Sequence, residues 1–179
     1  MVSIVRAERD ERDALLGFLE AQRGNVRRAA LGLSEEQAKA APSASALSVG
    51  GLIKHLAAAE RLWIRQILAG EAPPPGFDHA REQAQSFRVG PGETLAGLLA
   101  HYADVARETE EYIRGLPDLE RTVPVPMAPG SERSARWVLL HLIAETARHA
   151  GHADIVRESL DGAVSSELIA AEERQTQDA

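Results

Sequence analysis

The chain has 179 residues, of which 44% are hydrophobic and 26% are charged, and its formal net charge is −7 at pH 7. This length suits a single domain with its own hydrophobic core, and the composition excludes wholesale disorder and a fibrous repeat. An acidic chain without a cluster of Lys and Arg is a poor partner for nucleic acid. Because the sequence contains no cysteine, any thiol chemistry requires a thiol that a small molecule supplies.

The N-terminal region, residues 1–13, is rich in charged residues and offers no apolar segment of a secretion signal. The longest apolar stretches fall far short of the roughly 20 residues that span a bilayer. The sequence therefore predicts a cytoplasmic protein without membrane spans.

The first half of the chain predicts two long helices. Apolar residues near a 3.6-residue period favour an amphipathic helix over residues 6–31. Ser34 is typical of the cap of a short helix, which Pro42 closes. Ser48 can cap the second long helix, which runs to about residue 69 and ends before a run of prolines.

The second half predicts two further long helices, joined by long connections. Residues 70–92 are rich in proline and glycine and predict a long connection over one end of the bundle. A third helix is expected from about residue 93 to 115, followed by an extended crossover loop over residues 122–129, where Val and Pro alternate. Ser131 or Ser134 can cap the fourth helix, which reaches about residue 160.

Four long helices predict an all-α protein with a four-helix bundle and long crossover loops. We expect the bundle to occupy residues 1–162. Residues 163–179 form a C-terminal tail or a short helix that docks on a partner.

Potential metal ligands cluster near the end of the chain, where His141, Glu145, His149 and His152 lie on one arc of a single helix face. Glu145 and His149 are one turn apart, the spacing at which two side chains converge on one ion. A third ligand must come from another helix, and His55 is the candidate because its apolar neighbours place it toward the bundle interior. The predicted metal ligands are thus His55, Glu145 and His149, with His152 and His141 as possible further ligands or as residues that support the ligands from behind.

A carboxylate with two imidazoles binds Zn²⁺, Ni²⁺, Mn²⁺ or Fe²⁺ and leaves open coordination positions, with zinc favoured here.

The other histidine, aromatic and charged residues have interpretations that do not involve a metal. The histidines outside the cluster are expected to be exposed or capping: His79 and His101. The aromatic residues at helical spacing are expected in the core: Trp63, Tyr102 and Trp137. Four charged residues near the candidate ligands either support the ligands from behind or are helix-surface charges, and the surface interpretation is favoured: Glu60, Arg61, Arg148 and Asp154.

Two sequence stretches carry a resemblance to a known family. They are SVGGLIKHL at residues 48–56, with Glu60 and Trp63 following, and HLIAETARHAGHADI at residues 141–155. From about residue 6 to 160 the chain resembles the DinB/YfiT-like superfamily, most closely the branch that includes the mini-circle proteins.

The resemblance implies a four-helix bundle with a metal at one end, held by a histidine of the second helix and a pair spaced four apart on the fourth. These positions are His55, Glu145 and His149. A carboxylate at position 145 is similar to the mycothiol-dependent maleylpyruvate isomerase, but the additional C-terminal domain of that enzyme has no counterpart here, so its particular reaction is not expected. His152 stands where many relatives have glutamine, beside or just behind the metal.

Characterised relatives use low-molecular-weight thiols and are often dimeric. The resemblance therefore implies a metal-dependent enzyme, a homodimer, that transfers a mycothiol-like thiol to a small electrophile or hydrolyses a related conjugate. Two alternatives stay open at this point. A non-catalytic bundle that binds a divalent metal or small ligand predicts a closed site with His152 or His141 as a fourth ligand, and a purely structural dimer predicts no metal.

Overall fold

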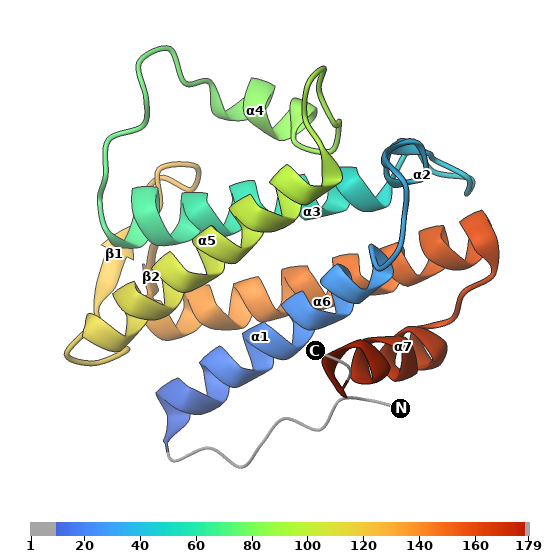
Figure 1. Cartoon of the computed structure of the whole chain (residues 1–179). Coiled ribbons are helices and arrows are strands. Elements are labelled where there is room, and N and C mark those ends of the chain that lie inside the picture. The colour runs from blue at the N-terminus through green and yellow to red at the C-terminus, as the bar shows by residue number, and fades with distance from the viewer. Residues whose placement is uncertain (1–9, 178–179) are drawn as a thin grey trace.

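The computed structural model describes residues 10–177 of the chain, and within this range it is built almost entirely of helices. The bundle consists of α1 (Glu11–Ala29), α3 (Val49–Arg61) continued by the π-helix η1 (Leu62–Leu68), α5 (Leu95–Gly115) and α6 (Ala135–Asp161). Figure 1 shows these four long helices packed across one another. The all-α fold is confirmed.

Side-chain caps fix where the helices begin. The carboxylate of Asp10 caps α1, and the hydroxyls of Ser48, Thr94 and Ser134 accept backbone N–H bonds at the starts of α3, α5 and α6. Of the two caps considered for the last long helix, Ser134 is therefore the one used. Ser34 forms a complete capping box at α2 (Glu35–Lys39), as the sequence predicts.

Three segments differ from the prediction. Residues 70–92 contain a helix, α4 (His79–Gln85), which buries none of its residues and therefore has no apolar period to detect. Figure 1 shows α4 lying outside α3. The strip predicted as a loop from residue 122 includes β1 (Thr122–Pro124), which pairs antiparallel with β2 (Glu132–Ser134). The second helix also changes to π geometry at residue 62, which its apolar period does not reveal.

The C-terminal segment forms α7 (Ser165–Gln177), which lies against α1 of the same chain. Leu168 is buried there, and a guanidinium nitrogen of Arg28 lies 3.0 Å from the carboxylate of Glu172. The part of the first predicted helix at residues 6–9 lies outside the described residues.

A polar layer divides the hydrophobic core into two clusters. One cluster includes Leu52 and Leu56 of α3, and the other includes Ile64 and Leu68 of η1. Between them on the same helix lies Glu60, whose residue exposure is 2%. The interpretation of Glu60 as a surface charge is wrong, because its carboxylate faces the bundle interior.

The partners of Glu60 come from two other helices. Arg23 of α1 donates from Nε to Oε2 of Glu60 over 3.0 Å and from a terminal nitrogen to Oε1. Thr109 of α5 donates its hydroxyl to Oε1 over 2.5 Å. Both carboxylate oxygens therefore have protein donors, and the layer ties α1, α3 and α5 together.

The aromatic residues are divided between core and surface. Tyr102 is buried, as predicted, whereas Trp137 is 39% exposed and Trp63 is partly buried. The expectation of a core position is wrong for Trp137, which stacks on His141 at the bundle surface with ring centroids 5.1 Å apart. Among the charged residues considered with Glu60, Arg61 and Arg148 are exposed and Asp154 is half-buried.

Candidate metal centre

His55 of α3 and the pair Glu145 and His149 of α6 meet at one place in the bundle. One ligand atom from each residue lies within 4.8 Å of the others. Oε1 of Glu145 is 3.1 Å from Nε2 of His149 and 3.6 Å from Nε2 of His55. Two ring nitrogens from different helices thus approach the same carboxylate oxygen.

The two distances to Glu145 lie close to those in a metal site, whereas the limit of 4.8 Å for the whole group is wider. A tetrahedral metal with ligand bonds of about 2.0–2.2 Å separates its ligand atoms by about 3.3–3.6 Å. Nε2 of His55 is also buried without a hydrogen-bond partner among the described residues. A buried ring nitrogen in that state costs free energy unless something binds it, and a cation between the three side chains would do so.

The orientation of His55 is set by the segment that follows α4. Ser86 donates its hydroxyl to the carbonyl of Gln83 over 2.8 Å. Its oxygen lies 2.9 Å from Nδ1 of His55. Because the Ser86 proton is already used, Nδ1 of His55 is the donor of this bond, which leaves the lone pair on Nε2 toward Glu145. The tautomer is therefore the one that a metal ligand needs.

Phe87 covers the same histidine. Its ring stacks on that of His55 with centroids 3.8 Å apart and lies 5.5 Å from the ring of His149. Gly51 at the start of α3 makes this approach possible, and Gly50 beside it admits the backbone of α2. A Cβ on Gly51 would lie 2.1 Å from the carbonyl oxygen of Phe87, and one on Gly50 would lie 2.9 Å from that of Ala38.

Burial governs the protonation of the two imidazoles. Desolvation, followed by the charge of His149, lowers the pKa of His55, and desolvation also lowers the pKa of His149. Burial opposes ionisation of Glu145, but His149, His55 and Arg148 together lower the pKa of its carboxyl. The cluster thus favours neutral imidazoles with an ionised carboxylate, the forms that bind metals.

The cluster opens toward solvent at Glu145. Its side chain is 21% exposed, compared with 3% for His55 and 8% for His149. Arg148 donates to Oε2 of Glu145 over 3.2 Å, which leaves Oε1 to the two histidines. A small molecule could therefore reach the cluster from this side.

The two additional candidates lie on either side of the three-residue group. His152 is exposed, and its Nδ1 lies 3.2 Å from Nδ1 of His149, within hydrogen-bond distance. His141 belongs instead to an aromatic cluster, stacked on Trp137 and edge-on to Trp63. The structure brings His55, Glu145 and His149 together, sets His152 directly behind His149, and leaves His141 outside the group.

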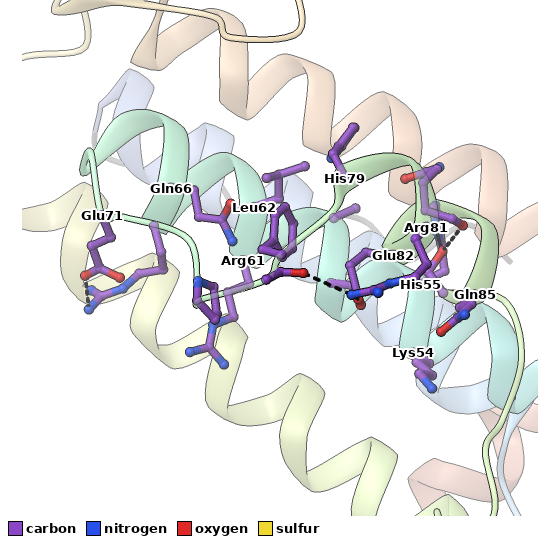
Figure 2. A pocket seen from close by; sticks show the side chains of 18 of the residues that line it. Lys54, His55, Arg61, Leu62, Gln66, Glu71, His79, Arg81, Glu82 and Gln85 are labelled. Carbon is purple, nitrogen blue, oxygen red and sulfur yellow. Dashed lines mark hydrogen bonds and ion pairs between the residues drawn. The ribbon is translucent and has the colours of Figure 1, made fainter.

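A cavity of about 550 Å³ lies between α3, η1 and the segment that carries α4 (Figure 2). It reaches the three-residue cluster only at His55 and its partner Ser86, since neither Glu145 nor His149 lines it. His79 and His101 are exposed, as predicted, but both line this cavity. The roles of Ser86 and Phe87 were not predicted, because neither residue belongs to a periodic pattern in the sequence.

The fold and the cluster define a helical bundle with a potential metal-binding group between two of its helices. The family model for mycothiol-S-transferase matches residues 14–162, so the chain belongs to this mycothiol-S-transferase, DinB/YfiT-like family. The predicted resemblance is confirmed at that level. No curated protein matches the sequence significantly.

A solved structure supports the fold. The chain is similar to a conserved protein from Enterococcus faecalis, with a TM-score of 0.68 and 16% sequence identity, over 87% of this chain and 100% of that one. At this identity the likeness concerns the fold alone. Within residues 10–177, no helix combines the length and apolar character required to cross a membrane.

Proposed function

We propose that this chain is a metal-dependent thiol transferase that joins mycothiol, or a similar low-molecular-weight thiol, to a small electrophile. The observation that carries the proposal is the buried, unpartnered Nε2 of His55, which faces Glu145 and His149 from another helix. Membership in the mycothiol-S-transferase family supports a low-molecular-weight thiol as one of the substrates. The lack of cysteine fits a reaction in which the small molecule supplies the sulfur.

His55, Glu145 and His149 would hold the divalent cation, with zinc favoured by the mixture of imidazole and carboxylate ligands. When bound, the cation supplies Lewis acidity, which lowers the pKa of a thiol at the site. The remaining tasks belong to the chain. Ser86 keeps the lone pair of His55 directed at the site, and Arg148 holds the outer oxygen of Glu145.

Phe87 packs over both histidines and excludes water from that side of the cluster. The proposed reaction is a substitution at carbon. The thiol releases its proton to solvent, its sulfur forms a bond to the electrophilic carbon, and the leaving group departs with the electrons of the bond that breaks.

Hydrolysis of a thiol conjugate at the same cluster, with a small-molecule substrate in either case, is the other form that this chemistry could take. Homodimer formation and a cytoplasmic location stay predictions from the sequence.

Elemental analysis of protein purified without a histidine tag tests the metal site. We expect nearly one equivalent of divalent metal in the unaltered chain and its loss in His149→Ala. The control is His79→Ala, which removes an exposed imidazole at the start of α4 and should retain the metal. Metal-loaded protein should then consume mycothiol in the presence of some member of a panel of electrophiles.

Two results would count against the proposal. If neither protein held metal after reloading, the purely structural interpretation would replace it. If the loaded protein bound metal but showed neither thiol affinity nor thiol-dependent turnover, the non-catalytic metal-binding bundle would be the better account.

A further inference from the structure

The cavity beside His55 has the size and the lining of a small-molecule site. Its volume of about 550 Å³ lies within the range of about 300–1,000 Å³ that is usual for ligand pockets. Ala58 and Ala59 of α3 form part of its wall, where their small side chains leave room, and Leu62 and Phe77 add apolar surface. An apolar body of modest size would fit this lining.

The charge of the lining contrasts with that of the whole molecule. The chain carries a formal charge of −7, yet the cavity is lined by four Lys or Arg residues and only two glutamates. Three of the four basic residues have carboxylate partners. Lys54 pairs with Glu93 at 2.8 Å, and Arg65 pairs with Glu71 at 2.5 Å.

Arg81 is the third, since one of its terminal nitrogens lies 3.7 Å from Glu82 and donates to the carbonyl of Gly76. The fourth is Arg61, at the last position of α3, which pairs with no carboxylate among residues 10–177. Figure 2 shows Arg61 among the side chains around the cavity. A guanidinium without a carboxylate partner at the wall of this cavity is suited to bind a carboxylate.

The position of Arg61 relative to His55 makes this anchor relevant to the reaction. The two residues are six apart on one helix, which corresponds to about 9 Å along its axis. Both line the same cavity. A molecule anchored at Arg61 could therefore extend along α3 toward the metal cluster.

We propose that this cavity binds the acceptor substrate, an electrophile with an apolar body and a carboxylate that pairs with Arg61. The bound molecule is an acceptor only if the protein transfers a thiol, so this part of the inference rests on the proposed function. Binding of a carboxylate by Arg61 does not depend on the metal. It can therefore be measured without turnover.

The first experiment uses metal-free protein, so that a carboxylate cannot bind a cation instead. Amide chemical shifts are followed during titration with 4-phenylbutyrate and with 4-phenylbutanamide, its neutral analogue. We expect the acid to bind about fivefold more tightly than the amide, the size of effect usual for an accessible ion pair. The shifts should include Ala58 and Ala59.

The decisive variant is Arg61→Gln, which keeps a long polar side chain on an exposed helix position. It should abolish the preference for the acid and leave binding of the amide unchanged. The control is Arg107→Gln on α5, which removes an equal charge outside the cavity and should retain the preference. The proposal is overturned if acid and amide bind equally to the unaltered chain, if Arg61→Gln keeps the preference, or if Arg107→Gln loses it as well.

A second experiment uses metal-loaded protein with mycothiol and two electrophiles, 4-(bromomethyl)benzoate and 4-(bromomethyl)benzamide. In each case the sulfur replaces bromide at the methylene carbon. Arg61→Gln should raise KM for the acid about fivefold, with little change in kcat or in either constant for the amide. An unchanged KM for the acid would contradict the assignment of the cavity to the acceptor.

The two proposals fail in different ways. Loss of the acid preference in metal-free Arg61→Gln supports the carboxylate site even where the loaded protein transfers no thiol. Thiol transfer that proceeds without any acid preference supports the proposed function and overturns the cavity assignment.

Discussion

Two buried polar clusters lie on the same helix, five residues apart, and they differ in whether the protein completes them. At Glu60 both carboxylate oxygens accept hydrogen bonds, from Arg23 and Thr109. At His55 one ring nitrogen is bonded to Ser86, whereas Nε2 is buried without a hydrogen-bond partner among the described residues. The first cluster is satisfied by the chain alone, and the second requires something more.

The difference has a physical meaning. Buried polar groups are normally paired, so a complete cluster is explained by the stability and specificity of the bundle. An incomplete cluster of two imidazoles and a carboxylate costs free energy that the fold does not recover. We infer that the cluster at Glu60 has a structural role and that the cluster at His55 has a binding role. Each prediction below tests one side of this comparison.

The largest effect is expected at the structural cluster. Glu60→Ala leaves the guanidinium of Arg23 buried without its main partner and should lower the free energy of unfolding by about 3–5 kcal/mol. Urea denaturation measures this change. Glu110→Ala removes an exposed carboxylate paired with Arg114 and should stay within about 0.5 kcal/mol. Equal effects of the two substitutions would mean that the polar layer does not hold the helices together.

The next largest effect is expected at Gly51, where the segment with Ser86 and Phe87 packs closely against α3. In Gly51→Ala the new Cβ meets the carbonyl oxygen of Phe87, so the segment with Ser86 must move, at a cost of about 1–3 kcal/mol. Metal affinity should fall at the same time, because His55 loses its bond to Ser86. Thermal unfolding and chelator competition measure the two effects.

The matched control is Gly151→Ala in the middle of α6. Apart from the adjoining backbone of α6 itself, no atom lies within 4 Å of the Cβ that this substitution adds, and alanine favours a helix by about 0.5–1 kcal/mol over glycine. It should therefore raise stability. If Gly51→Ala did the same, the close packing of Phe87 on α3 would be contradicted.

Ser86→Ala tests the incomplete cluster more directly. Loss of the bond to Nδ1 frees the ring and the tautomer of His55, and removal of such an outer partner weakens metal binding by about 10–100-fold. The measurement is competition for zinc with a chromophoric chelator. Ser159→Ala removes a serine hydroxyl that, within the described part of the chain, donates to the carbonyl of Ile155 on α6, so it is the control and should leave zinc affinity unchanged. An unchanged affinity in Ser86→Ala would mean that Ser86 does not orient the ligand.

The long helices could be predicted from the sequence because each has an apolar period, and Ser48 marks where one of them begins. The grouping of His55, Glu145 and His149 could also be predicted, because Glu145 and His149 share a helix face and His55 has apolar neighbours. The helix α4 could not, since it buries no residue and leaves no period in the sequence.

The hydrogen-bond partners of Glu60 and His55 could not be predicted from the sequence either. Glu60 pairs with Arg23, 37 positions earlier, and His55 pairs with Ser86, 31 positions later. Such pairs depend on how helices pack, and a single sequence contains no signal for them. The pair Gly50 and Gly51 was a clue to a close backbone approach, but it did not reveal which segment approaches.

The smallest effect is expected at His152, and it distinguishes an open site from a closed one. Its Nδ1 lies 3.2 Å from that of His149, but the residue is exposed, so water can replace the bond when the ring is removed. His152→Ala should therefore weaken zinc binding by less than about tenfold in chelator competition. A fourth ligand would behave differently, because its loss would weaken binding nearly as much as His149→Ala. That outcome would favour the closed, non-catalytic site, whereas a small loss leaves a coordination position free for a thiol.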